Sequence, residues 1–492
     1  MTYDKVRPKF GKAPLLGLND LIAWAFLALS IVVALFRPLI PYDSWAYHLP
    51  FSSYLFAIGG GNVTFHMNTL LDERWLGFPK AWEWIEGLVW ASTGSLRLTI
   101  VPQIVLCLAY FFYLGRVYTV PVSWLICGFF ASPLLLIHFQ SIYLDLPAGL
   151  CAALGFFLLL DLLATTRTRD AVFSWRTAAS AVATLGLAGN IKYQGFFMAA
   201  CVLAVTTILI LTARDMTGRF RLIILATIAA AGLLASATLV TNLVRTHNPF
   251  YPLAITVLGT NIFIGPESQD TDASYPTYLL SESRPIALPE SVNFILSITE
   301  LDWTMRGVAP WYNIDSVSGR TPRRGEPSRT GGLGALFVLL NGFLLIFQAA
   351  NIRRELDLRQ RLLVFGAVLL TFFTVFMPRV HELRYWLYLP LVLLPINMRY
   401  LSRMNYHPAV PMALVAMMLY GVSLAVLSPK SELLTRRALS MAELRAEIPP
   451  AIAKSLSDTG RYCDAEHDNL FRYSQAVTGL PGLVSSNVAD CR

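Results

Sequence analysis

Long apolar runs recur along this chain and constrain its fold more than any other feature. Most approach about 20 residues, the length that an α-helix needs to cross the hydrocarbon core of a bilayer. Hydrophobic residues make up 55% of the 492 residues and charged residues only 14%, against about 25% charged in soluble proteins. A soluble chain of this composition could not cover its surface with polar groups. The sequence therefore predicts an all-α polytopic membrane protein and excludes a cytosolic enzyme, a disordered chain and a disulfide-rich secreted scaffold.

The apolar runs predict about eleven transmembrane helices. The first extends from Leu21 to about Ile40, and no small-residue cleavage site closes it, so we expect a retained span rather than a cleaved signal. The others are expected at 98–115, 123–139, 148–164, 177–191, 196–213, 222–243, 332–349, 362–377, 386–398 and 409–427. The chain thus divides into an N-terminal segment at 1–20, a membrane domain at 21–427 and a C-terminal tail at 428–492.

The arginines between the spans indicate the orientation. The basic residues of segment 1–20 place the N-terminus in the cytoplasm, because cytoplasmic segments retain Lys and Arg. With eleven spans, the arginine-bearing short segments fall on that same side: they contain Arg116, Arg167, Arg169, Arg176, Arg214, Arg219, Arg221, Arg353, Arg354, Arg359, Arg361, Arg399 and Arg403. This asymmetry accounts for the net charge of +8, so the charge does not call for a nucleic-acid partner.

Three outer segments are too long to be simple connectors: a first outer loop at 41–96, a long outer loop at 247–331 and the tail. Structureless loops of such length are uncommon, so we expect 247–331 to form a lid or small subdomain. Within the first loop, 46–58 and 79–94 are candidate juxtamembrane helices. Glu83 and Glu86 share one face of 79–94 with tryptophans nearby, which favours a helix lying in the interface over a span.

The six cysteines fall into two groups. Cys107, Cys127, Cys151 and Cys201 lie in apolar runs, where a cysteine is typically a small buried apolar residue. Cys463 and Cys491 lie in the polar tail, where a disulfide requires that the tail be outside the cytoplasm.

Polar and ionisable residues gather on the outer side in this topology. The candidate site residues are Asp43, Tyr47 and His48 after the first span, Asp145 after the third, Lys192 after the fifth, Arg245 and His247 after the seventh, and Arg384 and Tyr385 after the ninth. Charged groups at membrane depth are costly and tend to mark a functional site. Their convergence on one side predicts a site for an anionic, lipid-linked substrate.

Simpler interpretations remain open for single residues. Asp43 follows Pro41 at the end of a span and could cap the next short helix, since Asp is a favoured cap. Asp145 precedes Pro147 and could cap the fourth span in the same way. Lys192 and Arg384 could be snorkelling anchors at span ends. Arg320, Arg323, Arg324 and Arg329 suit a solvated loop or contacts with lipid headgroups.

The order and sidedness of these motifs resemble the polytopic GT-C glycosyltransferases, in particular the family 39-like group with protein O-mannosyltransferases and the lipid A aminoarabinose transferase. The motifs are Asp43 in YDSWAYHLP, Asp145 in SIYLDLP, Lys192 in GNIKYQG, and Arg384 with Tyr385 in HELRYWLYLP. The HNPFYPL turn looks like one found in uncharacterised bacterial members. Several relatives have two adjacent acids in the first loop, whereas Ser44 follows Asp43 here.

The resemblance implies a GT-C fold with periplasmic juxtamembrane helices in the bacterial inner membrane, and a multi-pass chain whose site faces the periplasm. It also implies a polyprenyl-phosphate sugar as donor, and as acceptor a hydroxyl of a glycan, lipid or protein. Transfer in one step would invert the anomeric centre. No nucleic acid is expected, and membrane lipid is the other partner.

Such a transfer assigns roles to the candidate residues. Asp43 would take the proton of the acceptor hydroxyl as general base. Lys192 and Arg384, with Arg245 next, would stabilise the departing phosphate. Asp145 would bind a sugar hydroxyl or orient the partner of Asp43.

Tyr47, His48, His247 and Tyr385 complete the expected substrate site. No tight metal-ligand spacing is present, so no metal site is predicted. A divalent cation on Asp43, Asp145 and His247 stays an alternative.

Two other functions are alternatives to this transfer. An O-antigen polymerase or ligase would also use a lipid-linked donor and a long outer loop, but here the acids come early in the chain. A lipid-linked substrate transporter or flippase should carry ionisable residues at mid-membrane on broken helices, whereas here they lie at one rim.

Overall fold

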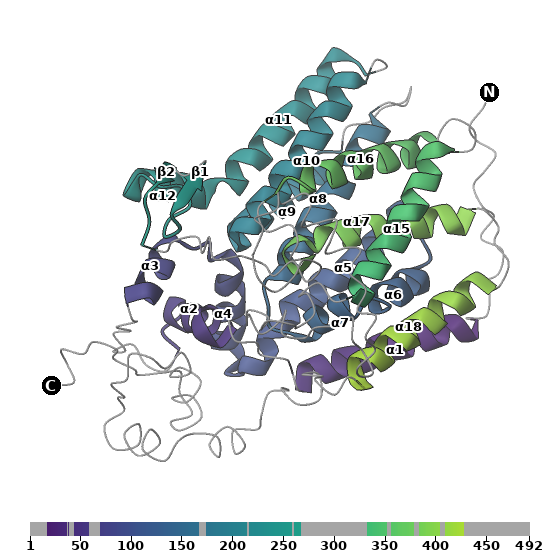
Figure 1. Cartoon of the computed structure of the whole chain (residues 1–492), viewed down its shortest axis with the longest axis horizontal. Coiled ribbons are helices and arrows are strands. Elements are labelled where there is room, and N and C mark those ends of the chain that lie inside the picture. Colours follow the sequence, from purple (N-terminus) through teal and green to yellow (C-terminus); the bar gives the residue numbers. More distant parts are fainter. Residues whose placement is uncertain are drawn as a thin grey trace, which may run out of the picture.

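The computed structural model describes residues 17–36, 38, 44–58, 69–166, 174–213, 216–257, 260–266, 332–351, 356–377, 383–403 and 409–427. Within these residues the chain is mostly helical (Figure 1). The first half contains α1 (Leu18–Phe36), a π-helix (Ser44–His48), α2 (Leu49–Leu55), α3 (Thr69–Gly77), α4 (Ala81–Thr93), a 3-10 helix (Leu96–Ile100), α5 (Val101–Val117), α6 (Val122–Phe130), α7 (Pro133–Gln140), α8 (Asp145–Thr165), α9 (Trp175–Ile191), α10 (Tyr193–Thr212), α11 (Gly218–Ala235) and α12 (Ala237–Thr246). Then follow β1 (Ile255–Val257), β2 (Thr260–Phe263), α15 (Gly332–Ala350), α16 (Leu358–Thr374), a 3-10 helix (Leu383–Trp386), α17 (Tyr388–Arg403) and α18 (Ala409–Leu427).

Several helices are long and apolar enough to cross a bilayer. Among the described residues five segments qualify, namely Leu18–Phe36, Leu96–Val117, Asp145–Thr165, Tyr193–Thr212 and Gly218–Ala235, or six if the bent pair α6 and α7 is one span. Helices also occupy the other predicted segments, as α9, α15, α16, α17 and α18. The multi-pass membrane character is therefore supported, while the count of about eleven spans stays a prediction.

Two predicted spans are not single straight helices. Segment 123–139 is divided into α6 and α7, which are bent by 98°. Ser132 has φ −93° and ψ 111°, because a residue before proline is driven out of the helical region, and here Pro133 follows. Segment 222–243 is interrupted at Ser236, whose hydroxyl donates to the carbonyl of Leu233 at 3.0 Å. Serine and threonine bonds of this kind often bend helices.

Helix α8 forms the centre of the bundle. In its most apolar 18-residue stretch 94% of the residues are buried, and it packs against α9, α10, α17, α5 and α16 (Figure 1). Small residues bring its neighbours close. A side chain on Gly149 would meet the backbone of Tyr388 at 3.1 Å, and one on Gly155 would meet Leu185 at 2.5 Å. Residues at the two ends of α8 are therefore held in position by several helices.

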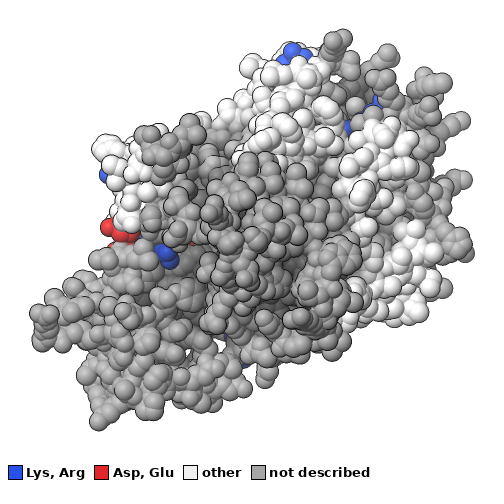
Figure 2. All heavy atoms as spheres, in the orientation of Figure 1, with Lys and Arg blue, Asp and Glu red and all other residues white. Residues whose placement is uncertain are grey.

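Large apolar side chains are exposed on the outside of the bundle. Leu222 and Leu233 on α11 are 69% and 75% exposed, and Phe343 on α15 is 67% exposed. In Figure 2 the described surface is largely uncharged, with Lys, Arg, Asp and Glu near its edges. Large apolar side chains left exposed in this way suit contact with lipid. The cysteines predicted to be buried, Cys107, Cys127, Cys151 and Cys201, are buried and free, whereas Cys463 and Cys491 lie outside the described residues.

The elements that do not cross the bundle gather at one of its ends. Helices α2, α3, α4 and α12 and the antiparallel β1–β2 pair lie together on the left of Figure 1. Helix α4 occupies the predicted juxtamembrane segment 79–94 and is not among the candidate spans. The arrangement provides a covering layer next to the start of α8.

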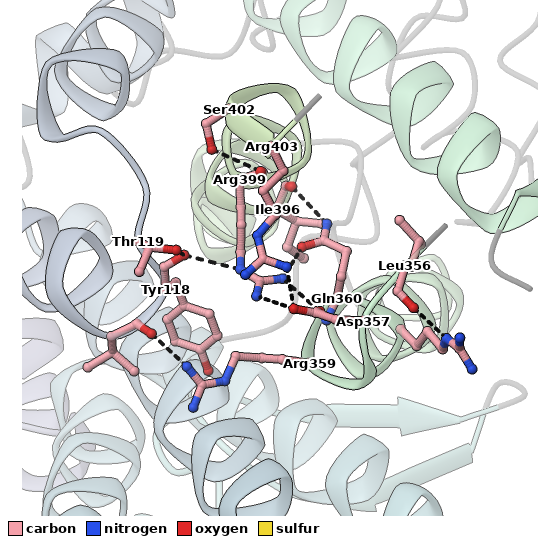
Figure 3. A network of polar contacts seen from close by, with 12 residues as sticks. Tyr118, Thr119, Leu356, Asp357, Arg359, Gln360, Ile396, Arg399, Ser402 and Arg403 are labelled. Carbon is pink, nitrogen blue, oxygen red and sulfur yellow. Dashed lines mark hydrogen bonds and ion pairs between the residues drawn. The ribbon is translucent and has the colours of Figure 1, made fainter. Parts of the chain in front are cut away.

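A polar network ties helices together near the other end of α8 (Figure 3). Arg399 on α17 is 2% exposed, donates to the carbonyl of Tyr118 at 3.1 Å and pairs with Asp357 at 3.0 Å. Arg359 on α16 pairs with Asp161 on α8 at 2.7 Å. Burial alone would raise the pKa of Asp357, but hydrogen bonds and charge from Arg399 outweigh it and hold that pKa below the usual range.

Candidate functional site

The start of α8 carries an ion pair between two predicted site residues. The ammonium of Lys192, between α9 and α10, donates to Oδ1 of Asp145 at 2.9 Å. The side chain of Asp145 is 1% exposed and that of Lys192 is 15% exposed. The cap of α8 is Leu144, without a side-chain hydrogen bond. Asp145 therefore acts as a partner for a cation and not as the helix cap that the sequence also allowed.

Arg384 lies beside this pair and is held by two tyrosines. Its guanidinium donates to the hydroxyl of Tyr143 at 2.8 Å and to that of Tyr385 at 2.7 Å. The residue is 2% exposed, so the alternative of a snorkelling anchor at the surface is wrong. Hydroxyl acceptors on two sides fix the plane of the guanidinium.

The two cations share the same two aromatic rings. The ammonium of Lys192 is 5.3 Å from the ring centroid of Tyr143 and 4.6 Å from that of Tyr385. The guanidinium carbon of Arg384 is 5.7 Å and 4.5 Å from the same two centroids. Electron-rich ring faces attract cations at such distances. We call Asp145, Lys192, Arg384, Tyr143 and Tyr385 the two-cation cluster.

His48 and Tyr47 lie next to this cluster. His48 Nδ1 is 2.7 Å from Oε1 of Glu83 on α4, and both side chains are buried. The ring of His48 meets that of Tyr143 at a centroid distance of 6.3 Å, edge to face. The ring of Tyr47 is 4.2 Å from that of His48, and the guanidinium carbon of Arg74 is 5.3 Å from the Tyr47 centroid. The π-helix thus places Tyr47 and His48, two predicted site residues, next to the two-cation cluster.

Helix α4 brings ionisable groups into the interior. Burial first, and then the charge of Glu83, raises the pKa of Glu86 well above its usual range. Burial likewise lowers the pKa of Lys80 to about 8, and its ammonium donates to the carbonyl of Phe78 at 2.7 Å. The polar face of 79–94 was expected in the membrane interface, but Glu83 and Glu86 are 1% and 2% exposed. They pack against protein because α4 lies on α2 and α9.

Three residues of the site were not found from the sequence: Glu83 as a histidine partner, Tyr143 and His138. His138 Nε2 is 3.9 Å from Oδ2 of Asp145, and its ring meets Tyr143 at 5.7 Å. His138 lies on α7, after the bend from α6. Tyr143 stands two residues before Asp145 in SIYLDLP, which was the signal available for it.

Two predicted residues lie away from the cluster. Arg245 and His247 at the end of α12 are exposed, and no contact among the described residues joins them to Lys192 or Arg384. His247 ends α12 in the left-handed conformation, with φ 59°.

The HNPFYPL turn that follows α12 connects elements of the covering layer by hydrogen bonds. Asn248 donates to the carbonyl of Leu253 at 2.7 Å and to that of Ile264 at 3.1 Å. The hydroxyl of Tyr193 lies 2.7 Å from the carbonyl oxygen of Gly77 and also within hydrogen-bond distance of that of Tyr251, so its one proton is shared between the two. The turn therefore joins α3, α10 and the β1–β2 pair.

The alternative of a divalent cation finds no support in the described part of the chain. In that part, no group of three His, Cys, Asp or Glu side chains could hold a metal ion. Of the proposed ligands, Asp145 pairs with Lys192, His247 is exposed, and Asp43 lies outside the described residues. No protein-family model, no curated protein and no solved structure matches this chain.

Proposed function

We propose that this protein is a membrane glycosyltransferase of the GT-C type that transfers a sugar, with inversion, from a polyprenyl-phosphate donor to an acceptor hydroxyl. The observation that carries the proposal is the two-cation cluster. It places an ammonium and a guanidinium on the same two tyrosine rings beside a buried carboxylate. Few substrates need two fixed cations at the rim of a membrane bundle, and a lipid phosphate is one of them.

The cluster suits the departing phosphate. As the bond from the anomeric carbon to the phosphate oxygen breaks, negative charge grows on that oxygen. Cations that are already oriented lower the energy of this transition state without reorganising. Two tyrosine hydroxyls orient Arg384 and one carboxylate orients Lys192, so both cations are fixed before the substrate arrives.

Asp145 suits the sugar. Its Oδ1 accepts from Lys192, while Oδ2 is buried and has no hydrogen-bond partner among the described residues. A buried carboxylate oxygen accepts hydrogen bonds readily, and a sugar offers several hydroxyl donors. Asp145 thus links the phosphate-binding cation to a position for the sugar ring.

The remaining roles rest on the sequence. Asp43, proposed as the general base, lies outside the described residues, as does the part of the long outer loop at 267–331. The acceptor is a glycan, lipid or protein hydroxyl. The proposed location is the bacterial inner membrane with the site on the periplasmic side, in line with arginines near the far end of α8.

The test is release of polyprenyl phosphate by the purified protein from a panel of polyprenyl-phosphate hexoses and pentoses. The variant Arg384→Gln should lower kcat by about 10²- to 10³-fold, as the loss of a preorganised charge-stabilising donor does. The matched control is Arg359→Gln, an arginine paired with Asp161 away from the cluster, which should leave kcat unchanged. No release from any donor, or equal rates for Arg384→Gln and the wild type, would contradict the proposal.

A further inference from the structure

His48 and Glu83 form a buried pair to which the proposed function has so far given no chemical role. The two side chains are 4% and 1% exposed and 2.7 Å apart. An ionised carboxylate only accepts hydrogen bonds, so the proton between them resides on Nδ1. In the neutral imidazole the other nitrogen, Nε2, is then an acceptor with a lone pair. Glu83 thereby fixes both the tautomer and the direction of the ring.

That second nitrogen has no partner of its own. His48 Nε2 is buried without a hydrogen bond among the described residues, and the same is true of Oε2 of Glu83. Buried polar atoms are nearly always satisfied, and an unsatisfied one in a native site calls for an explanation such as a missing ligand. The unsatisfied Nε2, on the side of the ring away from Glu83, points to a polar group that binds it when substrate is present.

The pair adjoins the cations proposed for the phosphate. The ring of His48 lies edge to face against Tyr143 at 6.3 Å, and the hydroxyl of Tyr143 accepts from Arg384. Among the described residues, the charged groups near His48 include Glu83, Arg384 across the ring of Tyr143 and Arg74 across the ring of Tyr47. The ring of Tyr143 thus lies between His48 and the guanidinium proposed to bind the phosphate.

We infer that His48, oriented by Glu83, accepts the proton of the acceptor hydroxyl in the proposed transfer. The acceptor oxygen forms its bond to the anomeric carbon while the bond from that carbon to the phosphate oxygen breaks. The hydroxyl proton moves to His48 Nε2, and the bonding electrons leave with the phosphate beside Lys192 and Arg384. Glu83 stabilises the imidazolium that results. His48 is thus the catalytic residue, and Glu83 is its positioning residue.

The inference rests on the proposed function and competes with the assignment of the same proton to Asp43. Azide separates the two, because it is a nucleophile with no proton to give up at neutral pH. It attacks the anomeric carbon, the bond to the phosphate oxygen breaks, and a glycosyl azide forms without a base. A variant that lacks only the base should therefore regain turnover with azide, whereas a variant that lacks phosphate binding should not.

The experiment measures release of polyprenyl phosphate from the donor that the wild type uses, with water as acceptor and then with sodium azide. We expect His48→Gln to lower kcat by about 100-fold at unchanged KM, and azide to restore turnover as glycosyl azide. Glu83→Gln, which keeps an acceptor for Nδ1 and so preserves folding, should show a smaller loss with the same rescue. The control Glu86→Gln on the same helix should retain wild-type kcat.

Other outcomes overturn the inference in distinguishable ways. If kcat of His48→Gln is within twofold of the wild type, or if azide does not restore a lower kcat, His48 is not the proton acceptor. The proposed function is unaffected by either outcome. Rescue by azide of Asp43→Asn but not of His48→Gln assigns the base to Asp43. A wild type that releases no phosphate from any donor removes the proposed function and the inference with it.

Discussion

Removing either partner of the ion pair between Lys192 and Asp145 should destabilise the protein, but the loss of stability should be larger when Lys192 is removed. At 2.9 Å and an effective dielectric constant of about 20, the gross attraction between the two charges is about 6 kcal/mol. Most of it offsets the cost of burying the charges, and removing one partner of a buried pair typically costs about 3–5 kcal/mol. The variant Lys192→Met leaves a carboxylate that is 1% exposed, so we expect the full loss.

The opposite variant, Asp145→Asn, should cost less. It leaves an ammonium that is 15% exposed and lies 4.6 Å and 5.3 Å from the ring centroids of Tyr385 and Tyr143. Each ring contributes about 0.5–2 kcal/mol of attraction to a cation. We therefore expect a loss of about 1–3 kcal/mol, and a double variant less destabilised than the sum of the singles by about 2 kcal/mol or more.

The assay is unfolding in mixed micelles titrated with SDS, followed by tryptophan fluorescence, for the wild type, both single variants and the double variant. The comparison pair is Arg359 with Asp161, 29% and 15% exposed, whose greater contact with solvent should reduce the coupling to about 1 kcal/mol or less. If the losses at Lys192 and Asp145 add within about 0.5 kcal/mol, the two side chains do not form a buried ion pair, and the reasoning fails.

Three further perturbations test other parts of the structure. The raised pKa of Glu86 favours the protonated form in the fold, so the wild type should lose stability as pH rises above the usual carboxyl pKa. Glu86→Gln should remove this loss and raise the unfolding midpoint at neutral pH. Thermal unfolding of both proteins at several pH values measures the difference. Asp357→Asn should be less stable than the wild type at neutral pH, because Arg399 lowers the pKa of Asp357 in the fold. This difference in stability should shrink as pH falls below 3.8. An unchanged difference at low pH would contradict the pairing of Asp357 with Arg399. Gly77→Ala should lower the thermal midpoint, since an added methyl would lie 2.0 Å from the carbonyl of Tyr251; a wild-type midpoint would show that the turn does not pack there.

The helices could be located from the sequence because apolar length alone identifies a segment that is stable in lipid. Each predicted span falls largely on helical residues where the structure describes it. The breaks were missed because averaging over a window conceals a single residue. Pro133 was visible in the sequence, but only the geometry shows that the chain turns by 98° there. Ser236 carries an even weaker signal, since serine occurs in many straight helices.

The candidate site was predicted in part. Asp145, Lys192, Arg384 and Tyr385 meet in space, as their position at the ends of spans on one side suggested. The partner of His48 could not be found in this way, because Glu83 belongs to a helix whose burial depends on how the outer layer packs. The amphipathic pattern of 79–94 indicates a polar face, but it does not say whether water or protein covers that face.

Tyr143 has a consequence for how activity measurements on this protein are interpreted. One phenol group accepts a hydrogen bond from Arg384, lies within 5.3 Å of the Lys192 ammonium and makes T-shaped ring contacts with His48 and His138. Replacing it with phenylalanine would keep the ring contacts but remove one of the two hydrogen bonds that the guanidinium of Arg384 donates to tyrosine hydroxyls. Trimming it to leucine would disturb four neighbours at once. Comparing these two replacements therefore separates the effect of the hydrogen bond to Arg384 from the effect of ring packing, and neither replacement changes a charged residue.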